Sequence, residues 1–193
     1  MKIAAFFIAL LTISTVNAQL DQVKFKEATF ENGMMYPVAV VAGNKTVEDN
    51  INKHLQSQIQ DLKNADFCIG QYGFVQKGAH LQVHIFCNCI DFDESQNRYF
   101  LYNSQTGDNV KYNDLLNPKK IKITTAFLIN KAKAASSISE ADIQLIQEKN
   151  LDAFKIIFKR EGMDLWLKSE AWGEKPLFIA WREMKEMMKY SFL

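Results

Sequence analysis

The stretch from Phe67 to Phe92 constrains the fold most strongly, because it is rich in strand-forming residues and alternates between two kinds of position. One set of positions carries Leu81, Val83, Ile85, Cys87 and Cys89, and the positions between them carry His80, Gln82, His84, Phe86 and Asn88. This period of two is that of a β-strand with one buried face. A turn near Lys77-Gly78 would fold Phe67–Gln76 back against Ala79–Ile90, so the sequence predicts an antiparallel hairpin.

The buried face of such a hairpin needs a cover, and the segment before it predicts an amphipathic helix. Thr46 and Asp49 have the spacing of a capping box, so we expect the helix to open at Thr46. One apolar stripe follows at helical spacing: Val47, Ile51, Leu55, Ile59 and Leu62.

The rest of the chain continues as helices interleaved with mostly antiparallel strands. A strand at Arg98–Tyr102 is followed by a turn-rich hexamer, residues 103–108. Later elements are expected at Ile121–Ala135 and Ser139–Asn150 (helices), Ala153–Arg160 with Met163–Lys168 (hairpin), Leu177–Ile179 (strand) and Trp181–Tyr190 (helix). In the last helix, Trp181, Met184, Met187 and Met188 form a stripe expected in the core. The sequence therefore predicts a single α+β domain of mostly antiparallel sheet covered by helices.

The first eighteen residues have the features of a secretory signal peptide. Lys2 supplies a basic start, Ile3–Ile13 an apolar run, and Val16-Asn17-Ala18 the small residues of a cleavage site. The run is shorter than the ~20 apolar residues that a transmembrane helix needs, and no later segment qualifies. We expect residues 1–18 to be the signal peptide and residues 19–193 one secreted or periplasmic domain, with no transmembrane segment after cleavage.

The charge balance gives no reason to propose nucleic acid or an anionic membrane as partner. The chain has 23 basic and 22 acidic side chains, and removing Lys2 with the signal peptide leaves 22 of each. A net charge near zero lacks the basic excess of a nucleic-acid-binding protein.

Cys68, Cys87 and Cys89 are the three cysteines of the chain and are disulfide candidates. The predicted hairpin places Cys68 opposite the Cys87–Cys89 segment, and an oxidising compartment favours one cross-strand bond. Three buried, reduced cysteines are the alternative, and the pairing stays open. A catalytic thiol needs a neighbouring base, and the predicted strand face provides none.

The sequence contains no metal, cofactor or catalytic motif that we can identify. His80 and His84 share a strand face but are four residues apart, about 13 Å, which is too far for one ion. A hydrolase would need these histidines and the acidic cluster Asp91–Glu94 to converge in one pocket. Trp166 and Trp172, near the Lys168–Pro176 loop, are candidate ligand-binding aromatics.

The order of several short motifs resembles a known family. They are Tyr36-Pro37, Asn50-Ile51-Asn52, Tyr99–Asn103, Thr106-Gly107, Tyr112–Leu116, Phe154-Lys155-Ile156, Gly162–Trp166 and Trp181–Met184. The pattern resembles the extracytoplasmic domain of unknown function found in the anti-sigma factor RsiV and in the peptidoglycan deacetylase PdaC. The segment Ser169–Pro176 departs from the tyrosine- and proline-rich loop of that family, and the chain carries no deacetylase domain.

The resemblance implies an α+β domain that binds a component of the bacterial envelope without chemistry of its own. We therefore expect a non-catalytic binding module whose ligand is a lysozyme-like protein or a cell-wall glycan. The alternatives are a structural subunit of an envelope assembly, which would show a large apolar patch or an open sheet edge, and a hydrolase that modifies the wall.

Overall fold

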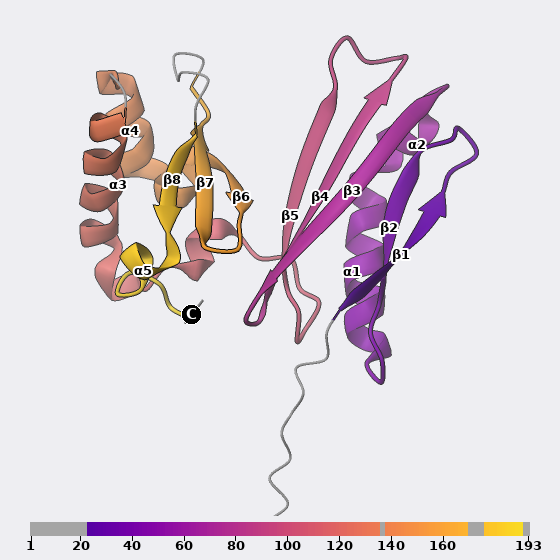
Figure 1. Ribbon diagram of the computed structural model, residues 1–193, viewed down its shortest axis with the longest axis horizontal. Helices are drawn as coiled ribbons and strands as arrows, with labels where there is room; N and C mark the ends of the chain where they lie inside the picture. Colours follow the sequence, from indigo (N-terminus) through magenta and orange to yellow (C-terminus); the bar gives the residue numbers. More distant parts are fainter. Residues whose placement is uncertain (1–22, 136–137, 170–175, 191–193) are drawn as a thin grey trace, which may run out of the picture.

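The computed structural model of the protein describes residues 23–135, 138–169 and 176–190, so the expected signal peptide and Trp172 lie outside the described residues. The predicted α+β fold is confirmed, with helices flanking antiparallel sheets (Figure 1). In chain order the elements are β1 (Lys24–Thr29), β2 (Met35–Val40), α1 (Lys45–Gln58), α2 (Gln60–Asn64), β3 (Cys68–Lys77), β4 (His80–Cys89), β5 (Gln96–Asn103), η1 (Tyr112–Leu115), η2 (Pro118–Lys120), α3 (Ile121–Ala135), α4 (Glu140–Lys149), η3 (Asn150–Ala153), β6 (Phe154–Phe158), β7 (Gly162–Leu167), β8 (Leu177–Ala180) and α5 (Trp181–Met184). Within the described ranges, no helix combines the length and apolar character needed to cross a membrane.

A first cluster of buried side chains lies between α1 and one face of the β3–β4–β5 sheet. Val47, Ile51 and Leu55 of α1 are at most 2% exposed and belong to one cluster with the alternating apolar residues of β4. The β3–β4 hairpin turns where the sequence predicts, with Lys77 opposite His80 and Gly78 at a φ of 53°. The helical stripe and the strand alternation thus meet as expected.

The start of α1 differs from the prediction. Asn44, not Thr46, is the N-cap, and its side-chain oxygen accepts a hydrogen bond from the backbone N–H of Val47 at 3.2 Å. Glu48 in the first turn accepts from the backbone N–H of Val41 at 3.1 Å. Asn is as good an N-cap as Thr or better, so the helix begins earlier.

The hairpin is closed at its open end by a disulfide bond. Cys68 and Cys89 face each other in the register, with their Cα atoms 4.1 Å apart, and are bonded. The neighbouring Cys87 is a free, buried thiol. Burial raises the pKa of the Cys87 thiol, which keeps it protonated and unreactive.

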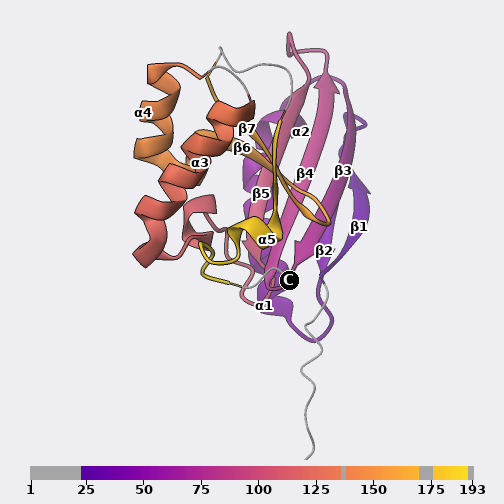
Figure 2. The same cartoon turned by 60° about the vertical axis from the view of Figure 1, so that its left-hand side comes forward.

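A second cluster of buried side chains lies between the β6–β7–β8 sheet and the helices α3 and α4. The two helices flank this sheet on the side away from the β3–β4–β5 sheet (Figures 1 and 2). Phe154, Ile156 and Phe158 of β6 alternate into the cluster. Ser139 caps α4 in a capping box with Asp142, as the sequence predicts.

The last helix is shorter than predicted. The sequence predicts a helix to Tyr190, whereas α5 ends at Met184. Beyond it the chain pairs with the segment after η1: Met188 forms a bridge with Leu116, and the Lys189 N–H donates to the Leu115 carbonyl at 2.7 Å. Met184, Met187 and Met188 are nonetheless buried, which confirms the prediction that this stripe is core.

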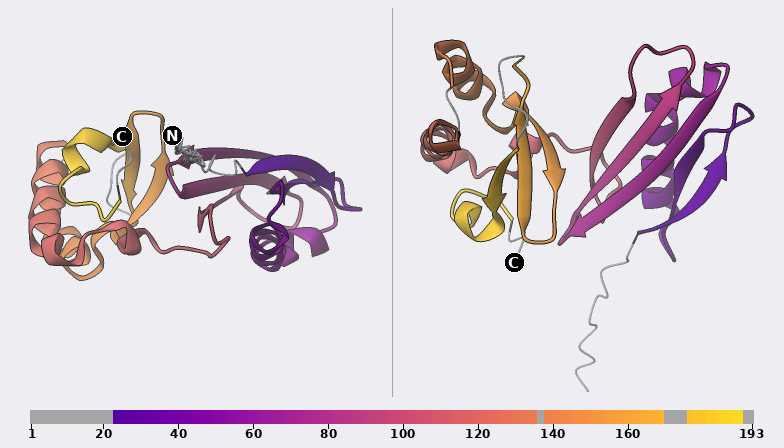
Figure 3. Two further views of the ribbon diagram at one scale, coloured as in Figure 1. Left: turned by 90° about the horizontal axis from the view of Figure 1, so that it is seen from below. Right: turned by 45° about the horizontal axis from the view of Figure 1, so that its top comes forward.

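The two parts of the domain meet where β6 approaches the β3–β4–β5 sheet on the face opposite α1 (Figure 3). Gln82 of β4, only 3% exposed, accepts from the Phe158 N–H at 2.8 Å and donates to the Ile156 carbonyl at 2.8 Å. Its amide also donates to the hydroxyl of Tyr112. The Gln82 side chain thus bonds the free edge of β6 much as the backbone of a neighbouring strand would.

Candidate functional site

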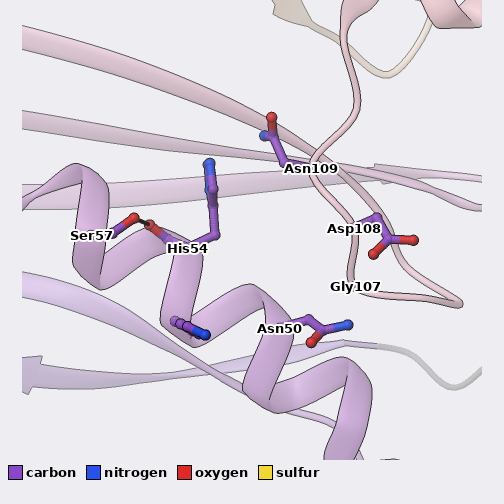
Figure 4. Close-up of a pocket in the computed structure, with 7 residues that line it drawn as sticks. Asn50, His54, Ser57, Gly107, Asp108 and Asn109 are labelled. Carbon is purple, nitrogen blue, oxygen red and sulfur yellow. Dashed lines mark hydrogen bonds between the residues drawn. The ribbon is translucent and has the colours of Figure 1, made fainter.

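The candidate site is a hollow of about 350 Å³ between the exposed side of α1 and the loop that follows β5. Both sides contribute polar side chains, and His54 extends from the helix toward Asn109 of the loop (Figure 4). The lining residues are Asn50, Lys53, His54, Ser57, Gly107, Asp108 and Asn109. We call this site the helix–loop hollow.

Gly107 allows the loop to approach α1 this closely. Its φ of +77° is one that L side chains rarely adopt, and a Cβ atom there would lie 2.6 Å from the Val47 carbonyl oxygen. The amide of Asn50 donates to the Thr106 carbonyl at 3.0 Å and fixes the loop against the helix. The hollow is therefore preformed in the described structure.

His54 is held by a residue buried in the core. Its Nδ1 lies 2.8 Å from the hydroxyl of Tyr102, which is 0% exposed. Burial lowers the pKa of His54 and raises that of Tyr102 well above its usual value, so both are neutral at pH 7. Because a phenol O–H is the stronger donor, we assign the bond as Tyr102 O–H to Nδ1, which leaves His54 Nε2–H as a donor toward the hollow.

The other groups of the hollow supply both donors and acceptors. The amide nitrogens of Asn50 and Asn109 are bonded to backbone carbonyls, which leaves their side-chain oxygens as acceptors. Asp108 adds an exposed carboxylate and Lys53 an exposed ammonium. Amide and carboxylate oxygens beside N–H donors can bind several hydroxyl groups of one ligand, since a hydroxyl both donates and accepts.

The contacts in the hollow do not assemble a nucleophile or a metal centre. Ser57 donates to the backbone carbonyl of His54 at 2.7 Å and not to its ring, so this bond does not activate the serine. Across the part of the chain that the structure describes, no three His, Cys, Asp or Glu side chains gather as a metal site would require.

The aromatic residues singled out from the sequence lie elsewhere. Trp166 is half-buried on β7 and opposite Lys155 of β6, in the second part of the domain, and it does not line the helix–loop hollow. Trp172 lies outside the described residues. No sequence motif marks the helix–loop hollow, because its polar residues come together only where α1 and the loop meet. The sequence feature that could have indicated this site is the Thr106-Gly107 turn, together with the polar face of the helix that contains Asn50.

The residues that a hydrolase would need are spread along β4. His80 opens the strand, is 2% exposed and lies 4.8 Å from the ring of Tyr190, centroid to centroid. His84 is stacked on Tyr99 with ring centroids 4.3 Å apart. Asp91 follows the far end of the strand and accepts from the Asp66 N–H at 2.7 Å. A strand of ten residues separates the ends by about 30 Å, so these groups do not converge.

Folding stability is expected to fall as the pH drops from about 7 to about 5.5. Burial lowers the pKa of His54, His80 and His84 in the folded protein, with a further contribution from Lys189 at His80 and from Lys155 at His84. The unfolded chain therefore takes up protons first as the pH falls through about 6.5, and stability declines until the folded-state pKa values are passed.

Urea denaturation at several pH values checks this expectation. The midpoint should fall between about pH 7 and about pH 5.5, and the slope should be smaller in a His84→Gln variant. Carboxylates such as Asp61, whose pKa is lowered by its hydrogen bond to Arg98, act at lower pH, so they do not obscure the effect. A midpoint that stays constant over this range would contradict the burial of the histidines.

Comparison with known proteins finds distant structural similarity to two members of a family of unknown function. No protein-family model and no curated protein matches the chain. A solved structure of a DUF3298 family protein from Pseudomonas aeruginosa PAO1 is 12% identical, with a TM-score of 0.45 over 90% of this chain and 98% of its own. A DUF3298 member from Bacteroides fragilis NCTC 9343 is 8% identical, with a TM-score of 0.47 over 88% and 92%. Similarity at this level carries no function, and the resemblance to the RsiV and PdaC domain stays a prediction.

Proposed function

We propose that the protein is a secreted or periplasmic, non-catalytic binding module that holds a cell-wall glycan in the helix–loop hollow. The observation that carries the proposal is the preformed hollow itself, in which His54 and Lys53 supply donors beside the oxygens of Asn50, Asp108 and Asn109. A sugar presents neighbouring hydroxyl groups that such a set of donors and acceptors can bind at once.

The electrostatics of the hollow favour a neutral, hydroxyl-rich ligand over a highly charged one. His54 is neutral at pH 7 because burial lowers its pKa. The exposed charges of Lys53 and Asp108 are opposite in sign and stand on the two sides of the hollow. A ligand with hydroxyl groups can bond both without bringing an uncompensated charge.

A second candidate is binding of an envelope protein through an apolar patch, which also fits a structural subunit. Phe67, Ile69, Phe86 and Ile90 are between 36% and 75% exposed. They lie on the sheet face opposite α1, because the register places Ile69 across from Asn88 and the Ile90 N–H bonds the Phe67 carbonyl. Clustered exposed apolar side chains of this kind mark interaction surfaces.

A co-sedimentation assay tests the glycan proposal. Purified protein is mixed with insoluble peptidoglycan, and retention is measured against protein concentration to give a dissociation constant. We expect saturable binding that is weakened at least about tenfold in Asp108→Ala and in His54→Phe. Gln105→Ala is the matched control, since Gln105 is exposed in the same loop but does not line the hollow.

The same assay distinguishes glycan binding in the helix–loop hollow from protein binding at the apolar patch. Lysozyme is the protein bait, and a Phe86→Ser/Ile90→Ser variant removes half of the apolar patch, while Trp166→Ala tests the surface expected from the sequence. The glycan proposal would be replaced by the protein-binding one if the protein bound lysozyme but not peptidoglycan. That binding should then be lost in the patch variant and unchanged in Asp108→Ala. Folded protein that is retained by neither bait would refute both.

A further inference from the structure

A second hollow, of about 530 Å³, lies in the other part of the domain, where the β3–β4 turn meets the β6–β7 turn and the start of α5. Lys77 ends β3, Arg160 and Glu161 form the β6–β7 turn, Phe178 lies on β8, and Arg182 follows the first residue of α5. We call it the basic hollow. It shares no lining residue with the helix–loop hollow.

The two arginines of the basic hollow lie beside the hydrogen bonds that join Trp181 to the β6–β7 turn. The Trp181 N–H donates to the Glu161 carbonyl at 3.0 Å, and the Trp181 indole N–H donates to the Lys159 carbonyl at 3.3 Å. Trp181 is itself 3% exposed. Arg160 precedes Glu161 and Arg182 follows Trp181, so both arginines adjoin the same backbone hydrogen bond. Their Cα positions are therefore fixed relative to each other.

The charge of the basic hollow is not balanced from within. Lys77, Arg160 and Arg182 line it with one acid, Glu161, and none of the three cations has an ion pair or side-chain hydrogen bond with any residue the structure describes. The hydrogen bond from Lys131 lowers the pKa of the Glu183 carboxyl, and Arg182 is close enough to contribute to that shift, but the carboxylate is paired with Lys131. Other cations of the same region do have partners: Lys159 pairs with Asp164 at 3.2 Å, and Lys131 pairs with Glu183. The excess positive charge is thus local to the basic hollow.

The wall of the basic hollow also offers an aromatic surface. Phe178 is 48% exposed and lies on the face of β8 that turns away from the buried cluster, since its neighbours Leu177 and Ile179 are buried. Guanidinium groups bind phosphate and carboxylate oxygens in a bidentate manner, and an exposed phenyl ring binds an apolar group beside them. A ligand that fits both features is amphiphilic and anionic.

We propose that the basic hollow binds a small ligand in which an oxyanion, phosphate or carboxylate, is attached to an apolar or aromatic body. The oxyanion bonds Arg160 and Arg182 with Lys77 adding charge, and the apolar body packs on Phe178. This site is independent of the glycan proposal, since each hollow can be tested in the absence of the other's ligand.

Isothermal titration with three probes tests the proposal: phenyl phosphate, benzoate and inorganic phosphate. We expect saturable binding of phenyl phosphate or benzoate, and which of the two binds more tightly identifies the oxyanion. Arg160→Gln/Arg182→Gln should weaken that binding at least about tenfold. Phe178→Ala should reduce the affinity for phenyl phosphate toward that for inorganic phosphate and leave the latter unchanged.

Lys119→Gln/Lys122→Gln is the matched control, because it removes the same charge from exposed lysines outside the basic hollow. A loss of equal size in this control would mean that the probes respond to net charge only, and the proposal would be wrong. The proposal would also be wrong if no probe saturates at millimolar concentration while the protein is folded. Far-ultraviolet circular dichroism, together with the tryptophan fluorescence to which the buried Trp181 contributes, verifies that each variant keeps its structure.

Discussion

Replacing Gly162 by alanine is expected to lower the free energy of unfolding by about 3 kcal/mol or more, one of the largest effects of any single methyl group in this chain. A Cβ atom at Gly162 would lie 2.2 Å from the carbonyl oxygen of Ile179 and 2.9 Å from the Cα of Ala180. Both are backbone atoms of β8, which pairs with β7 at this position. The strands must separate to admit the methyl group, and the second buried cluster loosens with them.

Gly73→Ala is the matched control for this prediction. A Cβ atom there would meet no heavy atom within 4 Å, and Gly73 is, like Gly162, a strand glycine without a positive φ. Alanine at this position should leave stability unchanged or raise it by up to about 1 kcal/mol, because it restricts the unfolded chain. Urea denaturation, followed by circular dichroism, compares the stabilities of Gly162→Ala and Gly73→Ala. Equal midpoints for Gly162→Ala and the unmodified protein would show that β7 and β8 are not so closely packed.

Local sequence patterns predicted the elements of the fold well, because each depends on neighbours in the chain. The alternation through β4 and the stripe Val47–Ile51–Leu55 placed one face of each element in the core, and both are buried. The capping box at Ser139 predicted the start of α4. The predictions were wrong at the ends of two helices. Asn44 caps α1 in place of Thr46, and the pairing of Met188 with Leu116 ends the last helix early.

What the sequence could not show is which distant elements meet. The period of two placed Gln82 and His80 on an outward face of β4, yet both are buried. Periodicity does not reveal that β6 bonds Gln82 or that the ring of Tyr190 lies against His80. The same limit applies to the candidate site. His54 and Tyr102 are 48 residues apart, and only the packing of α1 on the sheet brings their side chains together.

Replacing Gln82 by alanine is expected to lower the free energy of unfolding by about 3 kcal/mol or more and to weaken the junction between the two parts of the domain. The truncation removes the bonds that Gln82 makes to the Phe158 N–H and to the Ile156 carbonyl, and the carbonyl keeps only the longer bond from the Tyr112 hydroxyl at 3.3 Å. Each buried backbone group that loses its bond costs about 1–3 kcal/mol, and removal of the buried side chain adds a cavity.

Gln71→Ala is the control for Gln82→Ala, because Gln71 is exposed on the same face of the same sheet. Its replacement should change the free energy of unfolding little. Glu at position 82 sharpens the test, since it keeps the size of the side chain and replaces the amide donor by an acceptor. A carboxylate facing the Ile156 carbonyl is unfavourable, whereas a protonated carboxyl can donate to it as the amide did. Gln82→Glu should therefore regain stability relative to Gln82→Ala as the pH falls toward about 5, as measured by urea denaturation. A junction held by apolar contact alone would make Gln82→Glu and Gln82→Ala respond to pH alike.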